Sequence, residues 1–326
     1  MRPARIRQAN VRRAGQPLFP NDPGGEASKM WFRRSLRSRF LTLLNYSLLI
    51  LLCLVIVIPF WYVIVLSFNG GKDTAMGGVA FWPRAFTVNN YVQIFTDKNI
   101  LQGYGVTLFR TALGTALSVL CTAMAAYGLK CKEMPGHKLF TSIIVFTMLF
   151  GGNAVAYYIV LRTLKLTNTI WVYIIPGLYS AWNIILVRSF FETQGQSLED
   201  AATVDGAGVL RIFFQIALPL AKPVIAVIAL YNAVGQWSDW FAGAFYITDR
   251  NLRPVATILQ QMLVANTSVV NQAKNSYQAL NLVKYQVTGD SLKMAMVIVT
   301  MAPVMLMYPF IQKYFTSGIM LGAIKG

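Results

Sequence analysis

Long apolar runs separated by short polar segments dominate the chain. A helix needs roughly 20 mainly apolar residues to cross a bilayer, and six runs reach or approach that length. They are residues 41–68, 105–129, 139–161, 169–190, 219–247 and 292–312. The fourth run is interrupted by Pro176, Trp182 and Asn183. The pattern therefore predicts an all-α integral membrane protein with six transmembrane helices.

Composition supports the membrane assignment. The 326 residues are 56% hydrophobic and 13% charged, which leaves too little polar surface to cover a soluble globule. The basic residues also predict an orientation, because Lys and Arg near helix ends favour the cytoplasmic side. The first 40 residues contain ten of them. This predicts a cytoplasmic N-terminus, and six spans would return the C-terminus to the same side.

The formal net charge of +17 raises the possibility of nucleic-acid binding. However, the basic residues concentrate in a short tail that is rich in Pro and Gly and directly precedes the first span. Such a tail is typical of a topology signal that also contacts anionic lipid. We expect residues 1–38 to form a disordered basic cytoplasmic tail and residues 39–326 to form the transmembrane domain. No nucleic-acid partner is expected.

The sequence offers little for catalysis. Its cysteines, Cys53, Cys121 and Cys131, are odd in number and lack metal-ligand spacing, and the single histidine, His137, has no evident partners. Neither GxxxxGK nor GxGxxG occurs. We therefore expect no catalytic residue, no metal site and no cofactor bound by this chain.

A polar stretch between the fourth and fifth apolar runs has its own pattern. Ser197 is a plausible N-cap for a helix that ends near Val204, with acidic residues in its first turn. Asp205 and Gly206 predict a turn, and a second helical stretch follows from about Val209 to Ile216. The result would be a compact helix–turn–helix knob. An amphipathic segment lying on the lipid headgroups is the alternative.

The spacing of this stretch favours the knob. Asp200-Ala201-Ala202, then Gly206, then Ile216-Ala217-Leu218-Pro219 resembles the cytoplasmic EAA loop of ABC importer permeases, with Asp200 where glutamate is usual. Three further segments resemble carbohydrate-uptake permeases of the maltose type, in a second-permease branch linked to oligosaccharides of complex polysaccharides. They are Phe81-Trp82-Pro83, Tyr127-Gly128-Leu129 and the C-terminal run from Tyr308.

This resemblance implies a transport subunit of a prokaryotic cell membrane that is not itself an enzyme. Its partners would be a second homologous permease, two ATP-binding subunits, an extracytoplasmic solute-binding protein and the lipid bilayer. ATP and Mg²⁺ would bind to the partner ATPase. The coupling loop would span about residues 193–219. Its expected ATPase-coupling residues are Glu199, Asp200, Ala201, Ala202, Asp205, Gly206, Ala207, Phe213, Ile216, Leu218 and Pro219.

The substrate path is expected along the fifth span. Aromatic rings stack on sugar faces while amides and carboxylates bind hydroxyl groups, and this span carries both kinds of residue. The candidates are Asn232, Gln236, Trp237, Asp239 and Trp240, with Asn153 and Tyr157 from the third span. Packing of helices by buried polar groups explains the same residues equally well.

Two other functions stay open at this point. A permease for a non-sugar solute would carry the same loop. An ion-coupled secondary transporter is less consistent with the chain, because repeated halves are not evident and Asp239 is the only acid within a span. The segment 248–291 is long enough to require helix, and either contact with a binding protein or a lid over the membrane domain would explain it.

Overall fold

A computed structural model describes residues 36–194, 197–264 and 289–323. Within these ranges the regular secondary structure is helical, and extended pairing is limited to an isolated bridge between Asn69 and Phe86. The chain divides into two compact units, residues 1–60 and 61–326. Residues 1–35, most of the expected tail, lie outside the described ranges.

The first unit contains most of helix α2 (Leu36–Ser67), which continues into the second unit. The side chains of this helix are apolar on all of its faces, and Phe40, Leu43 and Leu48 are each more than half exposed. A helix that is apolar on all faces is stable when lipid or other apolar surfaces surround it. Its stretch Phe40–Ser67 is long and apolar enough to cross a membrane, as predicted.

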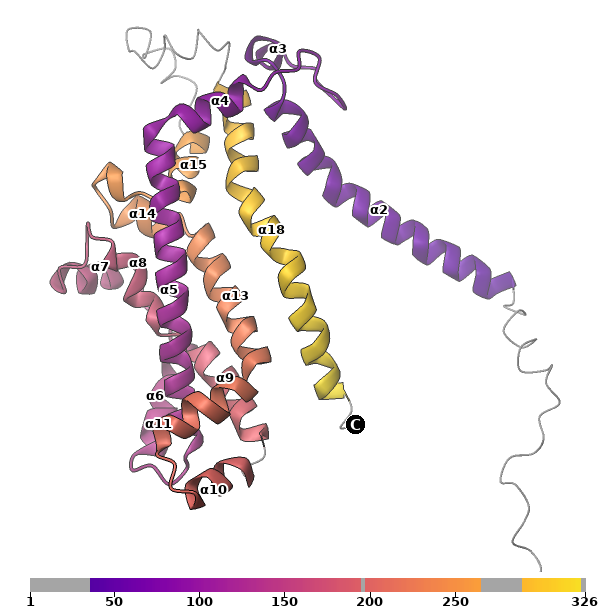
Figure 1. Cartoon of the computed structure of the whole chain (residues 1–326). Coiled ribbons are helices and arrows are strands. Elements are labelled where there is room, and N and C mark those ends of the chain that lie inside the picture. The colour runs from indigo at the N-terminus through magenta and orange to yellow at the C-terminus, as the bar shows by residue number, and fades with distance from the viewer. Residues whose placement is uncertain (1–35, 195–196, 265–288, 324–326) are drawn as a thin grey trace, which may run out of the picture. The chain divides into compact units, whose positions relative to one another are not determined.

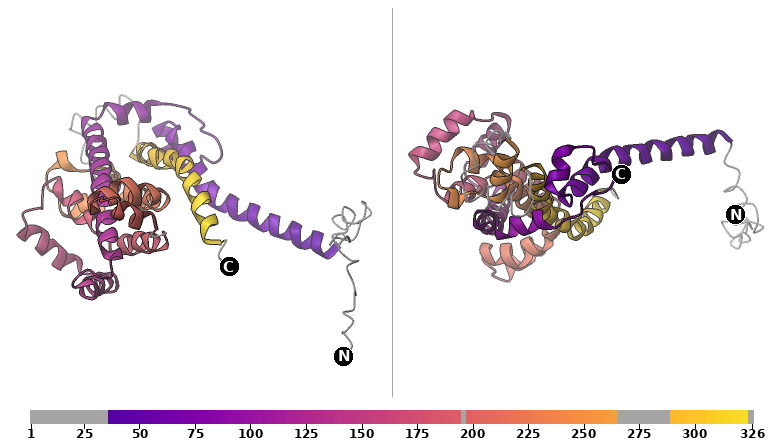
Figure 2. Two further views of the ribbon diagram at one scale, coloured as in Figure 1. Left: turned by 60° about the horizontal axis from the view of Figure 1, so that its bottom comes forward. Right: turned by 90° about the horizontal axis from the view of Figure 1, so that it is seen from above.

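The second unit is built around helix α5 (Lys98–Lys130), which packs against α9 (Ala181–Thr193) and α13 (Lys222–Ser238) (Figures 1 and 2). Ala123 and Ala126 of α5 are fully buried against Val187 and Phe191 of α9. Small residues let helix backbones approach closely, which is the usual way that membrane helices associate.

Helix α13 is covered on one side by a further helix. Helix α18 (Gly289–Ala323) packs against α13 and against α4 (Asn89–Thr96) and α15 (Val255–Val264) near one end of the unit (Figure 1). The indole Nε1 of Trp237 donates to the carbonyl oxygen of Thr300 at 2.9 Å. This bond ties α13 to α18.

Shorter elements complete the second unit. They are α3 (Gly71–Met76), α6 (His137–Leu149), α7 (Ala154–Thr163), α8 (Trp171–Ile174), η1 (Pro176–Leu178), α10 (Ser197–Val204), α11 (Val209–Ile212), the π-helix η2 (Phe213–Ala217), α12 (Leu218–Leu220), α14 (Phe241–Phe245) and η3 (Arg250–Leu252). The helix expected within 248–291 is confirmed by α15, and residues 265–288 lie outside the described ranges.

The six predicted spans are only partly matched. Three of the described helices are long and apolar enough to cross a membrane, and two bent pairs raise the number to five. The pairs are Trp171–Leu178 with Ala181–Thr193, bent by 43°, and Val209–Leu220 with Lys222–Phe245, bent by 82°.

The prediction of one continuous helix over 139–161 is wrong. Helix α6 ends at Leu149 and α7 begins only at Ala154. Gly151 and Gly152 disfavour a continuous helix from α6 to α7, because glycine loses more backbone conformational entropy on folding than any other residue. Asn153 then caps α7, its Oδ1 accepting from the backbone N–H of Val155 at 2.9 Å.

Candidate functional site

The 197–220 loop forms the predicted helix–turn–helix. Helix α10 begins at Ser197 and ends at Val204. The N–H of Gly206 bonds the carbonyl of Thr203 at 3.0 Å, and that of Ala207 bonds the carbonyl of Ala202 at 2.9 Å. These two bonds make a Schellman motif, which requires a left-handed residue just beyond the helix. Gly206 supplies it with φ of 79°.

The loop presents an apolar surface to solvent. Val204, Val209 and Leu210 are 88%, 70% and 66% exposed. Exposed apolar groups of this kind mark a surface that contacts either a protein partner or the membrane. Among the residues predicted for coupling, five are exposed, namely Asp200, Ala201, Asp205, Gly206 and Pro219.

The remaining predicted residues lie deeper. Phe213 is buried in the core, where its ring centroid is 5.2 Å from that of Tyr127. Ala202, Ala207, Ile216 and Leu218 are half-buried. The loop therefore has an anchored side and a free side.

Glu199 and Asp200 are neighbours in sequence but face different surroundings. Lys130 Nζ, at the end of α5, lies 2.8 Å from Glu199 Oε1, and these side chains are 9% and 17% exposed. Tyr127 Oη donates to Glu199 Oε2 at 3.4 Å. Glu199 thus bonds to its own chain, whereas Asp200 is exposed.

A cavity of about 300 Å³ lies beside α13, between α5, α7 and the α8–η1 segment. Its lining is rich in tyrosine and amide side chains. The polar and aromatic members are Arg110, Tyr157, Tyr173, Tyr231, Asn232, Gln236, Asp239 and Tyr246.

Four residues predicted for the substrate path, Asn232, Gln236, Asp239 and Tyr157, line this cavity, and three do not. Trp237 is buried and points to α18, and Asn153 is occupied as the cap of α7. Trp240 is 39% exposed and lies outside the lining.

An ion pair crosses the unit beside the cavity. Arg110 Nη2 of α5 lies 2.9 Å from Asp239 Oδ2, which follows the last residue of α13. The guanidinium also donates from Nε to Gln236 Oε1 at 3.2 Å, and its carbon lies 4.4 Å from the centre of the Tyr173 ring. Such pairing offsets the high cost of placing a cation inside a membrane protein.

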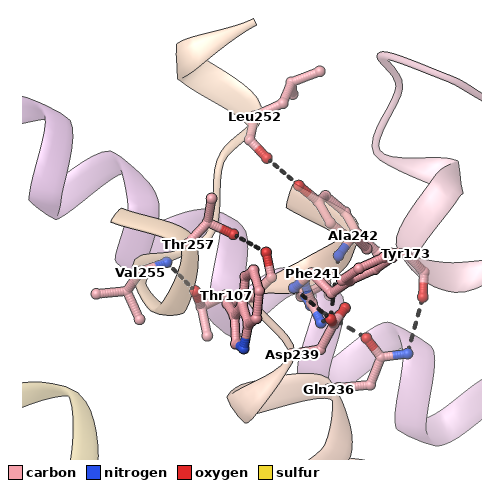
Figure 3. A network of polar contacts seen from close by, with 11 residues as sticks. Thr107, Tyr173, Gln236, Asp239, Phe241, Ala242, Leu252, Val255 and Thr257 are labelled. Atoms are coloured by element: carbon pink, nitrogen blue, oxygen red, sulfur yellow. Dashed lines mark hydrogen bonds and ion pairs between the residues drawn. The ribbon is translucent and has the colours of Figure 1, made fainter. Parts of the chain in front are cut away.

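Asp239 also organises the backbone at the break between α13 and α14. Its Oδ1 accepts from the N–H groups of Phe241 at 2.9 Å and Ala242 at 3.2 Å, so it satisfies two backbone donors in the first turn of α14 (Figure 3). The arrangement places one carboxylate between α5 and two successive helices.

Gln236 is fixed just as firmly. Its Nε2 donates to the carbonyl of Tyr173 at 2.9 Å (Figure 3). A Cβ built at Gly114 or at Gly177 would lie 2.9 Å from that same nitrogen. A side chain at either position would therefore require the amide to move. Gln236 uses both of its polar atoms within the chain and acts as a brace between α5, α8 and α13.

Arg110, Lys130, Tyr173 and Tyr246 are site residues that the sequence analysis did not select. Arg110 carried a usable signal, because a basic residue within a span requires a partner and Asp239 was the only acid within a span. Lys130 lies at a helix end, where a basic residue is ordinary, so its pairing could not be anticipated.

The segment after α2 is ordered by polar contacts. Asn69 Nδ2 donates to Asp73 Oδ2 at 2.8 Å, and Arg84 Nε lies 3.1 Å from the same oxygen. These two hydrogen bonds, that from Asn69 first, lower the pKa of the Asp73 carboxyl. Close by, Trp61 Nε1 donates to the carbonyl of Phe81 at 2.9 Å, which holds the Phe81-Trp82-Pro83 segment.

Comparison with known proteins places these features in context. A family model described as "Binding-protein-dependent transport system inner membrane component" matches residues 134–320. Protein LplC of Bacillus subtilis (strain 168) is 33% identical over 270 residues, which cover 83% of this chain and 90% of that protein.

A second relative in the same organism is the polygalacturonan/rhamnogalacturonan transport system permease protein YtcP. It is 33% identical over 291 residues, covering 89% of this chain and all of the relative. Among solved structures, a chain of a bacterial ABC transporter involved in the import of the acidic polysaccharide alginate matches with a TM-score of 0.79 and 29% identity. The match covers 86% of this chain and 98% of that one.

Proposed function

The chain belongs to the family of binding-protein-dependent transport system inner membrane components, and we propose that it forms half of a translocation path for an oligosaccharide. It is a permease subunit of an ABC importer with the type I fold, and ATP is hydrolysed by a separate subunit. The proposed partners are a second homologous permease, two ATP-binding subunits and the solute-binding protein that delivers the sugar.

The 197–220 loop is the proposed docking surface for an ATP-binding subunit. Its free side carries Asp200, Ala201 and Gly206 beside the exposed Val204 and Val209. A rigid, capped turn with one buried and one free side can transmit a displacement, because it moves as a unit. In the proposed cycle, closure of the ATPases on ATP moves this loop and turns the permease pair outward to receive substrate.

The single observation that carries the sugar assignment is the composition of the cavity. Tyr157 is 42% exposed and Tyr231 is 51% exposed, so each offers ring surface. Asn232 Nδ2 donates to the carbonyl of Ile228, and its Oδ1 accepts from Ser118, so the amide is held in place. Rings beside an oriented amide suit a ligand that has apolar faces and hydroxyl edges.

One relative and the solved structure add support, since YtcP is named for polygalacturonan and rhamnogalacturonan and the solved transporter for alginate. We place both termini on the cytoplasmic side of the membrane. The basic segment 1–38 then lies next to anionic lipid headgroups.

A pull-down from detergent-solubilised native membranes tests the assembly. The tagged chain is expected to bring an ATP-binding subunit and a second permease, identified by mass spectrometry. Asp200→Lys should lose the ATP-binding subunit, while Asp290→Lys at the start of helix α18 serves as the charge-matched control and should retain it. Recovery of the chain alone, or only with copies of itself, would count against the proposed assembly.

A further inference from the structure

We propose that helix α5 transmits movement of the 197–220 loop to the cavity, through one ion pair at Lys130 and another at Arg110. The pairs are Lys130–Glu199 and Arg110–Asp239. This inference rests on the proposed docking of the loop to an ATP-binding subunit. Lys130 and Glu199 would be positioning residues that neither dock nor touch substrate.

The first pair fastens the loop to α5. Lys130 and Glu199 are 2.8 Å apart and largely shielded from solvent, and Tyr127 Oη makes a second contact to the same carboxylate. One turn of helix away from Lys130, the ring of Tyr127 also packs against Phe213 of the same loop. Separating a shielded ion pair leaves two uncompensated charges, which is costly, so the loop and the end of α5 are expected to move together.

The second pair fastens α5 to the broken fifth helix. Arg110 is fully buried, and the carboxylate that it holds also accepts a hydrogen bond from the first turn of α14. A shift of α5 along its axis therefore acts on the point where α13 ends and α14 begins. Asp239, Gln236 and Ala242 all line the cavity at this point.

The connection between the two pairs is one helix. Arg110 and Lys130 are separated by about 20 residues, which at 1.5 Å per residue is about 30 Å along the axis. Helix α5 contains no proline and is a single element over Lys98–Lys130 (Figure 1).

The test uses the complete importer in proteoliposomes and measures ATP hydrolysed per sugar transported. Glu199→Gln should leave the ATP-binding subunit in the complex and raise this ratio by about 2- to 30-fold, the range of typical effects on coupling networks. The charge exchange Lys130→Glu with Glu199→Lys should return the ratio toward its original value. Asp290→Asn, which removes a carboxylate from the ion pair with Lys293 on α18, is the matched control and should leave it unchanged.

A cycle across the helix tests transmission itself. Distant, independent sites have additive effects, so the effect of Glu199→Gln should be the same in any background if the two pairs only stabilise. Transmission predicts that Glu199→Gln changes the ratio less in a protein that already carries both Arg110→Met and Asp239→Asn.

Three results would overturn the inference. They are an unchanged ratio in Glu199→Gln, strict additivity across the cycle, and loss of the ATP-binding subunit from Glu199→Gln, which would make Glu199 a docking residue. Failure of the proposed function looks different, because the unmodified chain would then retain no ATP-binding subunit.

Discussion

Removing Asp239 from the Arg110–Asp239 ion pair should destabilise the protein more than removing Arg110. The Arg110 side chain is 1% exposed, whereas that of Asp239 is 36% exposed and keeps two backbone donors, Phe241 and Ala242. Asp239→Asn therefore leaves a fully buried cation without a counter-charge. Arg110→Met leaves a carboxylate that still has hydrogen bonds and access to the cavity.

The structure lets the two costs be ranked. Removing one partner of a buried ion pair costs about 3–5 kcal/mol, and we expect Asp239→Asn to fall in this range. Arg110→Met should cost about 1–3 kcal/mol, the value of a charged hydrogen bond, because the remaining carboxylate is solvated. At about 2–4 °C per kcal/mol, the melting temperature should fall by about 6–20 °C for Asp239→Asn and less for Arg110→Met.

Thermal unfolding of the purified chain in detergent measures both variants and their combination. The double variant should be more stable than Asp239→Asn alone, because it contains no unpaired buried cation. Equal losses for the two single variants, or a double variant with the summed loss, would refute the reasoning. The same proteins separate bracing from a role in transport, since a double variant that regains stability but not transport indicates that Arg110 or Asp239 acts in the cavity that both line.

Three further predictions concern single positions. Gly206→Val places a β-branched residue at φ of 79° and should destabilise the turn by about 1–2 kcal/mol. The amount of co-purified ATP-binding subunit should therefore decrease while membrane insertion is unchanged. Gly206→Asn should retain the ATP-binding subunit. Gly114→Ala brings a Cβ to 2.9 Å from Gln236 and should lower the melting temperature by overpacking, unlike Gly128→Ala, where nothing lies within 4 Å. The pKa of Asp73 lies below its ordinary 3.8, so the ionised carboxylate stabilises the folded segment 69–86. Protection of its backbone amides from hydrogen exchange should therefore persist above pH 3.8 and decrease as the pH falls below 3.8. Asp73→Asn should abolish this pH dependence.

The features that depend on local sequence could be predicted. A serine, two acids and a glycine at the correct spacing determine where α10 begins and ends, and the left-handed Gly206 follows from the same few residues. The apolar runs likewise located the first, second and sixth spans to within a few residues at most ends. Hydrophobicity alone did not reveal the break at Gly151-Gly152, because the residues on both sides are apolar.

Side-chain direction could not be predicted because it depends on packing between distant segments. Trp237 follows Gln236 in sequence, yet Trp237 reaches α18 while Gln236 fits between two glycines of other elements. Glu199 and Asp200 differ for the same reason, since Lys130 comes close to only one of them. Locating these partners required the folded structure.

ATP hydrolysis by the purified importer in lipid nanodiscs, with and without the solute-binding protein and an oligosaccharide, tests the central claim most directly. We predict that hydrolysis rises only when the binding protein and its sugar are both present, and that Asp200→Lys removes this stimulation. Hydrolysis that responds to a non-sugar solute would contradict the substrate class. Sugar uptake that proceeds without ATP in the presence of an ion gradient would contradict the assignment of this chain to the path of an ATP-driven importer.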